Sequence, residues 1–412
     1  MSLELMPIEI IEEFRLDLWD VVNLQRLSRS MYELIKERAP RIFSLVNYKK
    51  GMEPWISILR NVRLSESYLK NLHLFSAIDV LDLSGTKIKN VSALSKVHTL
   101  DISCTNVEDV SALDKVHTLD LSHTLVEDAS ALGNVRFLNL RGTKVNDVSA
   151  LGRVYSLDIS RTKVKDISHL GEVRILDISD TDVKDVSTLE RVHTLNLSCT
   201  KVKDVSALGR VHTLDLSYTR VKDVSALGKV HALNLAFTKI KDVSALGGVH
   251  TLTLAYTSIS DISRLGEIHT LDLSHTQIKE VSRLGRVHTL NLTYTKVKDV
   301  SHLGGVHTLN LVGTDVEDVS ALGKVHTLNL SCTRVEDVSC LGGVHTLNLS
   351  YTAVKNVSHL GRNHTLDISH TNVRDVSRLG EVHILDISFT HVKDISMLGN
   401  VSKLIRSPLR YA

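Results

Sequence analysis

The sequence predicts an α/β-type solenoid, a rod with a parallel β-sheet on one face and short irregular or 3₁₀ segments on the other. The main observation is a 19-residue repeat, of which seventeen copies follow one another without insertion from Ile78 to the copy that begins at Val382. Apolar residues stand at positions 1, 4, 6, 11, 14 and 17 of almost every copy. A short fixed period over most of a chain is typical of a solenoid, in which each repeat buries its apolar side against its neighbours.

The strand is assigned from the first half of the repeat, for example in residues 211–229, VHTLDLSYTRVKDVSALGK. Leu214 and Leu216 are two residues apart, which is the spacing of one face of a β-strand. Thr219 at position 9 and Ser225 at position 15 recur in every full repeat. We expect both to face inward and to form polar ladders that satisfy backbone groups at the corners.

The second half of the repeat predicts the opposite wall of the solenoid. Val221, Val224 and Leu227 follow one another at steps of three. This spacing fits a 3₁₀ turn or an extended, polyproline-like segment, and both remain open. We expect Asp223 to cap a short turn and Gly228 to end it with a positive φ.

The pattern V-x-x-L-x-L-x-x-T-x-V resembles the core of the leucine-rich repeat, with Thr in place of the usual Asn or Cys. The wall pattern is similar to that of the short repeats of bacterial internalins and phosphatase-regulating subunits. The resemblance covers residues 59–404 and implies a parallel sheet on one side and short segments on the other. We divide the chain into residues 1–45, a helical segment; 46–77, a transition with a degenerate first repeat; 78–400, seventeen repeats; and 401–412, a short C-terminal cap.

The N-terminal segment resembles an F-box. It has a Leu-Pro-x-Glu-like start at residues 6–9, an Asp-Leu-x-Asp break at residues 17–20 and a Leu-x-x-Leu-Ser-Arg helix at residues 24–29, but Met31-Tyr32 stands where a Trp is usual. This resemblance implies that the segment docks a Skp1-like adaptor of a ubiquitin ligase. The adaptor-binding residues would be Pro7, Ile10, Ile11, Val21, Leu24 and Leu27.

The alternative is a plain interaction or structural scaffold in which these helices only cover the first repeat, since solenoid ends need a lid. An F-box-like segment on nearly identical tandem repeats also resembles the expanded repeat families of large DNA viruses of amoebae. We therefore expect a cytoplasmic protein, in the host cytoplasm if it is viral.

Composition narrows the classes of partner. The formal net charge is +2 and 42% of residues are apolar, a balance that does not call for nucleic acid or a membrane. The N-terminus lacks the basic start of a signal peptide, and the four cysteines suit a reducing compartment. We expect proteins as partners, no nucleic acid and no membrane.

No arrangement of residues predicts catalysis, a metal or a cofactor. The chain lacks a G-x-S-x-G motif and a phosphate-binding loop. Histidine stands at position 2 of thirteen repeats and Asp or Asn at position 5 of sixteen. Each is a single column, whereas a metal needs several convergent ligands. We expect an exposed sheet face here, and no enzyme.

Position 8 is the most variable position of the repeat, and we expect it to be exposed and free of packing. Four of the Phe and Tyr residues fall there within residues 211–305. Equal positions stack from repeat to repeat, so these rings should form a column bordered by polar residues at position 5. The partner-binding residues of this prediction are Tyr218, Phe237, Tyr256, Tyr294, Asp215, Asn234, Asp272 and Asn291. The alternative is that the rings only cover one another.

The C-terminus predicts an open sheet edge. The last repeat is followed by VSKLIRSPLRYA, in which a final strand near residues 401–405 has no long cap after it. An unpaired strand edge can join another chain. We expect weak self-association through this edge.

Overall fold

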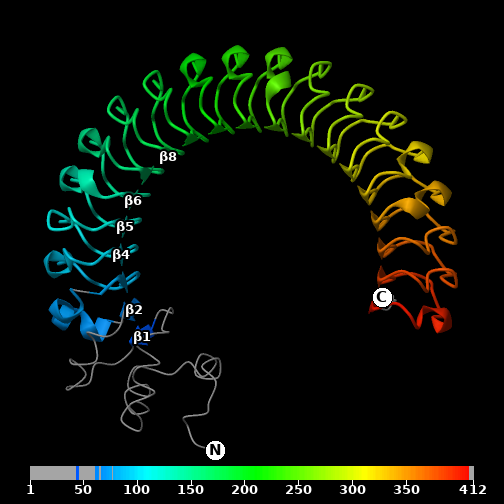
Figure 1. Cartoon of the computed structure of the whole chain (residues 1–412), viewed down its shortest axis with the longest axis horizontal. Coiled ribbons are helices and arrows are strands. Elements are labelled where there is room, and N and C mark those ends of the chain that lie inside the picture. The colour runs from blue at the N-terminus through cyan, green and yellow to red at the C-terminus, as the bar shows by residue number, and fades with distance from the viewer. Residues whose placement is uncertain (1–42, 46–60, 65, 77, 408–412) are drawn as a thin grey trace, which may run out of the picture. The chain divides into compact units, whose positions relative to one another are not determined.

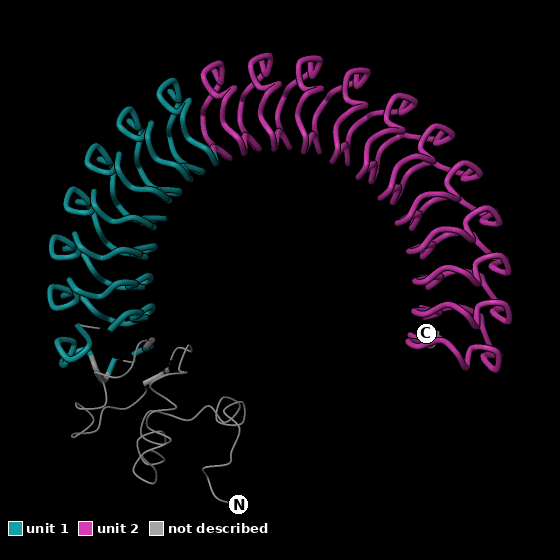
Figure 2. The backbone as a smooth tube through the Cα atoms, viewed as in Figure 1, with its two compact units in different colours: residues 1–196 teal, residues 197–412 magenta. Residues whose placement is uncertain are grey.

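The computed structural model describes residues 43–45, 61–64, 66–76 and 78–407 (Figure 1). The chain divides into two compact units, residues 1–196 and residues 197–412 (Figure 2). All six predicted adaptor-binding residues, from Pro7 to Leu27, lie outside the described residues.

Unit 1 is built from short parallel strands, each hydrogen-bonded to the strand of the next repeat. Its strands are β1 (Phe43–Leu45), β2 (Asn61–Leu64), β3 (Val80–Asp82), β4 (Thr99–Asp101), β5 (Thr118–Asp120), β6 (Phe137–Asn139), β7 (Ser156–Asp158), β8 (Ile175–Asp177) and β9 (Thr194–Asn196). Its 3₁₀ segments are η2 (Glu66–Phe75), η3 (Ser92–Leu94), η4 (Ser130–Asn134) and η5 (Ser149–Leu151). Because β1 falls within residues 1–45, the sheet begins earlier than the sequence predicted.

Unit 2 repeats the same design. Its strands are β10 (Thr213–Asp215), β11 (Ala232–Asn234), β12 (Thr251–Thr253), β13 (Thr270–Asp272), β14 (Thr289–Asn291), β15 (Thr308–Asn310), β16 (Thr327–Asn329), β17 (Thr346–Asn348), β18 (Thr365–Asp367), β19 (Ile384–Asp386) and β20 (Lys403–Ile405). Its 3₁₀ segments are η6 (Ser206–Leu208), η7 (Ser225–Leu227), η8 (Ser244–Gly248), η9 (Ser320–Leu322), η10 (Ser339–Gly343) and η11 (Ser396–Leu398). Within this unit, the strands line the inner side of a curve and the 3₁₀ turns lie on its outer side (Figure 1).

The constant repeat length fixes the register of every strand pair. Leu214 of β10 pairs with Leu233 of β11, and Leu233 with Leu252 of β12, so equal positions always oppose one another. In β10, β11 and β12 the middle residue points into the core, while its two neighbours are half-buried on the other face. Leu214 and Leu216 are at most 1% exposed, as the two-residue spacing predicted.

The opposite wall has two parts. Positions 10 to 14 form no regular element, and positions 15 to 17 make a single turn, which is 3₁₀ in several repeats. Val221, Val224 and Leu227 are buried as expected. The Ser225 N–H donates a hydrogen bond to Asp223 Oδ1 (2.9 Å), so the predicted acidic residue does satisfy the start of the turn.

Gly228 does not have the positive φ that we expected, because its φ is −63° and its ψ −9°. Its lack of a side chain matters for another reason. A Cβ at this position would overlap the carbonyl oxygen of Ala245 in the next repeat. Glycine at position 18 therefore lets neighbouring wall turns approach closely.

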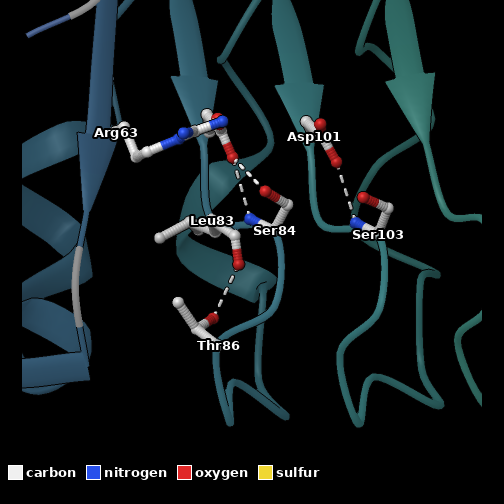
Figure 3. A network of polar contacts seen from close by, with 7 residues as sticks. Arg63, Leu83, Ser84, Thr86, Asp101 and Ser103 are labelled. Carbon is white, nitrogen blue, oxygen red and sulfur yellow. Dashed lines mark hydrogen bonds and ion pairs between the residues drawn. The ribbon is translucent and has the colours of Figure 1, made fainter. Parts of the chain in front are cut away.

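The threonine ladder is confirmed and the serine ladder is not. Thr219 is buried, and its Oγ1 donates to the Leu216 carbonyl (2.6 Å). Figure 3 shows the equivalent bond from Thr86 to Leu83 (2.7 Å) near the start of unit 1. Ser225 is exposed instead of facing inward.

Candidate recognition surface

The backbone at position 8 is left-handed in every one of the seventeen repeats, which the sequence did not predict. At fourteen of these positions a non-glycine residue has a φ between 54° and 59°, and at the other three a glycine has a φ between 65° and 70°. Non-glycine residues rarely adopt this conformation, which costs roughly 1–2 kcal/mol each. The type of side chain at position 8 therefore varies, but the backbone there is strained. We had expected this position to be free of constraint, and it is not.

Hydrogen bonds on both sides hold this strained residue in place. The Tyr218 N–H donates to the Ala236 carbonyl of the next repeat (3.0 Å), and the Thr219 N–H donates back to the Leu216 carbonyl (3.2 Å). One residue before Tyr218, the Ser217 N–H donates to Asp215 Oδ1 (2.8 Å). The turn is thus closed by groups that recur in most repeats, and the side chain at position 8 is pointed the same way each time.

The side chains at position 8 form an aromatic stack in unit 2. Ring centroids are 4.3 Å apart between Tyr218 and Phe237, 4.2 Å between Phe237 and Tyr256, and 4.1 Å between Tyr256 and His275. Tyr294 follows at 4.9 Å from His275, tilted by 35°. The four predicted rings are brought together and remain between 39% and 54% exposed. We call these five residues the aromatic stack.

His275 is the member of the stack that the sequence analysis missed. It is half-buried between Tyr256 and Tyr294. Its position in the repeat was the available signal, since a flat imidazole can continue a column of rings. A shorter stack in the same unit joins Tyr351, His370 and Phe389, with centroid distances of 4.1 and 4.4 Å.

A glycine ends the stack. Position 8 of the next repeat is Gly313, and a Cβ built there would overlap the ring of Tyr294. Tyr294 therefore lies over this glycine. In unit 1, the ring of His123 lies over Gly142 in the same way. A ring at position 8 thus leans toward the following repeat.

The predicted polar neighbours of the stack are placed beside it, but they also build the turn. Asp215, Asn234, Asp272 and Asn291 are half-buried, and each accepts a hydrogen bond from the backbone N–H at position 7 of its own repeat, at 2.8–3.1 Å. Asn234 also donates its Nδ2 to Asp215 Oδ2 (3.0 Å). A partner would therefore meet carboxylates and amides that are already oriented.

The histidines at position 2 form a second column. Ten of them, at every nineteenth residue from His212 to His383, stack in series with centroid distances of 4.6–4.7 Å. Within this histidine ladder, His269 Nδ1 lies 3.2 Å from the Thr270 hydroxyl, and the same contact recurs along the column. The pKa values of His269, His307 and His345 are lowered, mainly by desolvation and to a smaller extent by the neighbouring imidazoles.

The described residues contain no group of three His, Cys, Asp or Glu side chains that could hold a metal ion. None of their helices is both long and apolar enough to span a bilayer. Cys104, Cys199, Cys332 and Cys340 are free thiols.

Comparison with known proteins shows the fold. No protein-family model and no curated protein matches the sequence. A leucine-rich repeat protein from Leptospira interrogans has a similar structure, with 17% identity over 82% of this chain and 97% of that one and a TM-score of 0.58. The functional domain of InlJ from Listeria monocytogenes gives 18% identity, 78% and 75% coverage and a TM-score of 0.52. The chain has the leucine-rich repeat fold.

A third leucine-rich repeat structure, the mouse RP105/MD-1 complex, has 16% identity over 88% of this chain and 85% of that one and a TM-score of 0.58. These identities support the fold and nothing beyond it. The structure explains why Thr stands at position 9 of this repeat, where the leucine-rich repeat usually has Asn or Cys. Thr219 Oγ1 is a buried donor to a backbone carbonyl at the corner of the repeat.

Proposed function

We propose that this chain is a non-catalytic protein-recognition scaffold and that the aromatic stack is its contact surface in unit 2. The observation that carries the proposal is the stack itself: five rings in series, of which Tyr218, Phe237, Tyr256 and Tyr294 are 39–54% exposed. Exposed aromatic groups are enriched among the residues that dominate protein interfaces. Among the similar folds, RP105 is solved in a complex with MD-1.

The construction of the stack suits recognition. The rings stand on a backbone that the hydrogen-bond ladder fixes, so ordering them on binding costs little entropy. Half-buried Asp and Asn side chains lie beside them and provide polar groups around an apolar centre, as in the rim of an interface. Small residues at position 7, such as Ala236 and Ala255, leave room around the rings.

The alternative is that the rings only protect one another. Stacked pairs contribute about 0.5–1.5 kcal/mol beyond their burial, which is comparable with the cost of the left-handed backbone beneath each ring. A stack of this kind would then be close to neutral for stability. We favour recognition because stacking leaves the outer edges of the rings open to solvent.

Site-specific photo-crosslinking tests the contact surface. We would place a photoreactive benzoylphenylalanine at Phe237 and, in a control chain, at Lys241 on the opposite wall, and then irradiate each in cell extract. The proposal expects a discrete protein adduct from position 237 that is absent from position 241. Identical adducts from both positions, or none from position 237, would count against it.

We further propose that the scaffold serves as the substrate receptor of an F-box-type ubiquitin ligase in the cytoplasm. The support is the sequence pattern of residues 6–29, with its Leu-Pro-x-Glu-like start and Leu-x-x-Leu-Ser-Arg helix. Binding of a purified Skp1-like adaptor to the full chain tests this, with Leu24→Asp as the disrupting variant and Leu24→Met as the control. If the adaptor binds the original chain and both variants equally, or binds none of them, the ligase role is contradicted and the scaffold role alone remains.

We also propose weak self-association through β20. Among the described residues, β20 pairs with β19 and is the last strand of unit 2, and Ile405 is 37% exposed. Light scattering over a range of concentrations tests this proposal. A constant monomeric mass would contradict it, whereas loss of the larger species in an Ile405→Lys variant would support it.

A further inference from the structure

Three neighbouring repeats of unit 1 depart from the common His-Thr pair at positions 2 and 3. They carry Arg136-Phe137, Tyr155-Ser156 and Arg174-Ile175. Their strands β6, β7 and β8 are adjacent, and Ser156 pairs with Phe137 on one side and Ile175 on the other. A small hydroxyl residue thus lies between two large apolar ones on the outward face of the sheet.

This arrangement produces a hollow. Its lining includes Phe137, Ser156 and Ile175 at position 3, and Asp158 and Asp177 at position 5. Parallel strands are about 4.8 Å apart, so the two apolar walls stand on the order of 10 Å from each other. That spacing leaves room for one side chain over Ser156. We call this hollow the Ser156 slot.

The Phe137 wall is held in place by its neighbours. The Tyr155 ring meets Phe137 edge-on, with centroids 5.7 Å apart. The guanidinium of Arg136 lies 5.1 Å from the Tyr155 ring and 5.8 Å from the Phe137 ring. Tyr155 therefore packs with this wall. The opposite wall, Ile175, is 39% exposed, so an apolar surface there remains uncovered.

The acidic end of the slot differs from the other acidic positions beside it. Asn139 donates its Nδ2 to Asp120 Oδ2, and Asn196 donates its Nδ2 to Asp177 Oδ2, both at 2.9 Å. Asp158 is followed at the same position by Asp177, so the next repeat supplies no amide to it.

Burial, and to a smaller extent the charge of Asp177, raise the pKa of Asp158. Three described groups oppose this rise: the Ser160 hydroxyl and backbone N–H, which bond to the carboxylate, and Arg141, whose guanidinium donates to Ser160 Oγ (2.8 Å). The effect of burial outweighs these groups and the pKa stays raised, so a further cation beside the carboxylate would favour its charged form.

We propose that the Ser156 slot binds a lysine or arginine side chain of a partner protein. The aliphatic stem would lie between Phe137 and Ile175, and the cationic head would meet the carboxylate of Asp158. Long cationic side chains commonly bury their stems against apolar surface while the charge seeks a polar group. A charge-assisted hydrogen bond then fixes the orientation of the chain.

The direction of entry follows from the surrounding charges. Arg136 and Arg174 stand at position 2, on the other side of the slot from Asp158 along the strand. The cationic head must therefore point toward position 5 and away from them. An acidic residue next to the bound side chain would meet these arginines. The inference goes beyond the proposed contact surface, since it concerns unit 1 and uses no residue of the aromatic stack.

Three small probes test the slot by ligand-observed NMR titration of the full chain. They are the N-acetyl methylamides of lysine, norleucine and phenylalanine, which differ in the charge and shape of the side chain. We expect saturable binding of the lysine probe that is tighter than that of norleucine. Asp158→Asn should weaken binding of the lysine probe about fivefold and leave binding of the norleucine probe unchanged. Ser156→Phe should abolish binding of both probes, because it fills the slot.

Matched variants elsewhere in unit 1 provide the controls. Asp101→Asn and Thr99→Phe make the same changes at positions 5 and 3, where Val80 and Thr118 are the neighbours at position 3, and should alter nothing. Asparagine is the natural residue at position 5 in several repeats, so Asp158→Asn should fold, and melting curves check this. The proposal is overturned by tighter binding of the phenylalanine probe, by equal effects of Asp158→Asn and Asp101→Asn, or by no saturable binding of the lysine probe.

Discussion

The ring of Phe237 stacks on that of Tyr256 with centroids 4.2 Å apart and planes at 12°, although both residues have a left-handed backbone, with φ of 58° and 57°. The ladder hydrogen bonds from their N–H groups to the carbonyls of Ala255 and Ser274 hold both residues in this conformation. The most variable position of the repeat is thus the one with the most unusual backbone. The remaining constraints in the repeat can be tested one at a time.

Strain at position 8 predicts that glycine stabilises a repeat whose side chain there does not stack. Cys332 is exposed, has a φ of 57° and follows Gly313, so no ring precedes it in the column. Cys332→Gly should be more stable than Cys332→Ala by about 1 kcal/mol, since both lose the sulfur but only alanine keeps a Cβ at positive φ. Urea unfolding followed by circular dichroism measures this difference. Coincident curves for the two variants would refute strain at this position.

Asn363 predicts a stabilising substitution in the core. It replaces the usual valine at position 1 and is 1% exposed, and its Oδ1 has no hydrogen-bond partner. Its Nδ2 donates to the carbonyls of Leu341 and Val344. Leu341 also accepts from the Val344 N–H, as in the other repeats, so its carbonyl would remain paired.

Asn363→Val should therefore raise the free energy of unfolding by about 1–3 kcal/mol, which is the typical cost of an unpaired buried acceptor. Val344→Asn, the reverse change in the preceding repeat, is the matched variant and should lower stability. Thermal unfolding of both variants beside the original chain decides the point. A drop in melting temperature for Asn363→Val would mean that the amide contributes more than its unpaired oxygen costs.

Close approach of the wall turns predicts opposite outcomes for two glycines at position 18. A Cβ on Gly228 would overlap the Ala245 carbonyl, whereas a Cβ on Gly399 would meet nothing within 4 Å. Both glycines have ordinary helical φ, −63° and −59°, so backbone preference does not separate them. We expect Gly228→Ala to cost about 1–3 kcal/mol and Gly399→Ala to be near neutral. Equal melting temperatures for the two variants would show that the walls can move apart without cost.

The histidine ladder predicts a loss of stability on acidification. The pKa values of His269, His307 and His345 are lowered from the ordinary 6.5, because their imidazoles are partly desolvated and stacked on other imidazoles. The folded chain therefore takes up protons later than the unfolded chain. This stability is fully present above pH 6.5 and is lost as the pH falls from 6.5 through the lower folded pKa values.

A second loss is expected below pH 3.8. There the backbone N–H groups of the turns hold down the pKa of aspartates such as Asp109 and Asp223. Tyrosine occurs naturally at position 2 of one repeat, as Tyr155. A chain in which tyrosine replaces His269, His307 and His345 together should lose much of the stability change that begins at pH 6.5 and keep the change below pH 3.8. His391→Tyr, outside the ladder, is the control. Urea midpoints between pH 7.5 and 5 that fall equally in all three chains would contradict a role for the ladder.

The sequence was sufficient to predict the elements whose cause lies within one repeat. The two-residue spacing of Leu214 and Leu216 specified the strand, and Thr219 specified a buried polar ladder. Asp223 was also correctly placed at the start of the wall turn. These features follow from local hydrogen bonding and from which side of the repeat is apolar.

The features that the sequence did not reveal depend on contacts between repeats. The role of Gly228 depends on the carbonyl of Ala245 in the next repeat, and the left-handed φ of Tyr218 depends on the ladder bond to Ala236. His275 belongs to the aromatic stack because its ring stacks on Tyr256, and its residue type alone did not suggest this membership. The Ser156 slot likewise appears only when Phe137 and Ile175 are placed on either side of a small residue.

The central claim is that the aromatic stack recognises a protein. The most direct test is the double substitution of Phe237 and Tyr256 by alanine, with affinity for the crosslinked partner and melting temperature measured on the same preparations. The account predicts a loss of binding of about 2–4 kcal/mol with little change in melting temperature, because the buried Leu and Val positions are untouched. Unchanged affinity would contradict it, and a large fall in melting temperature with unchanged affinity would show that the rings serve only to pack against one another.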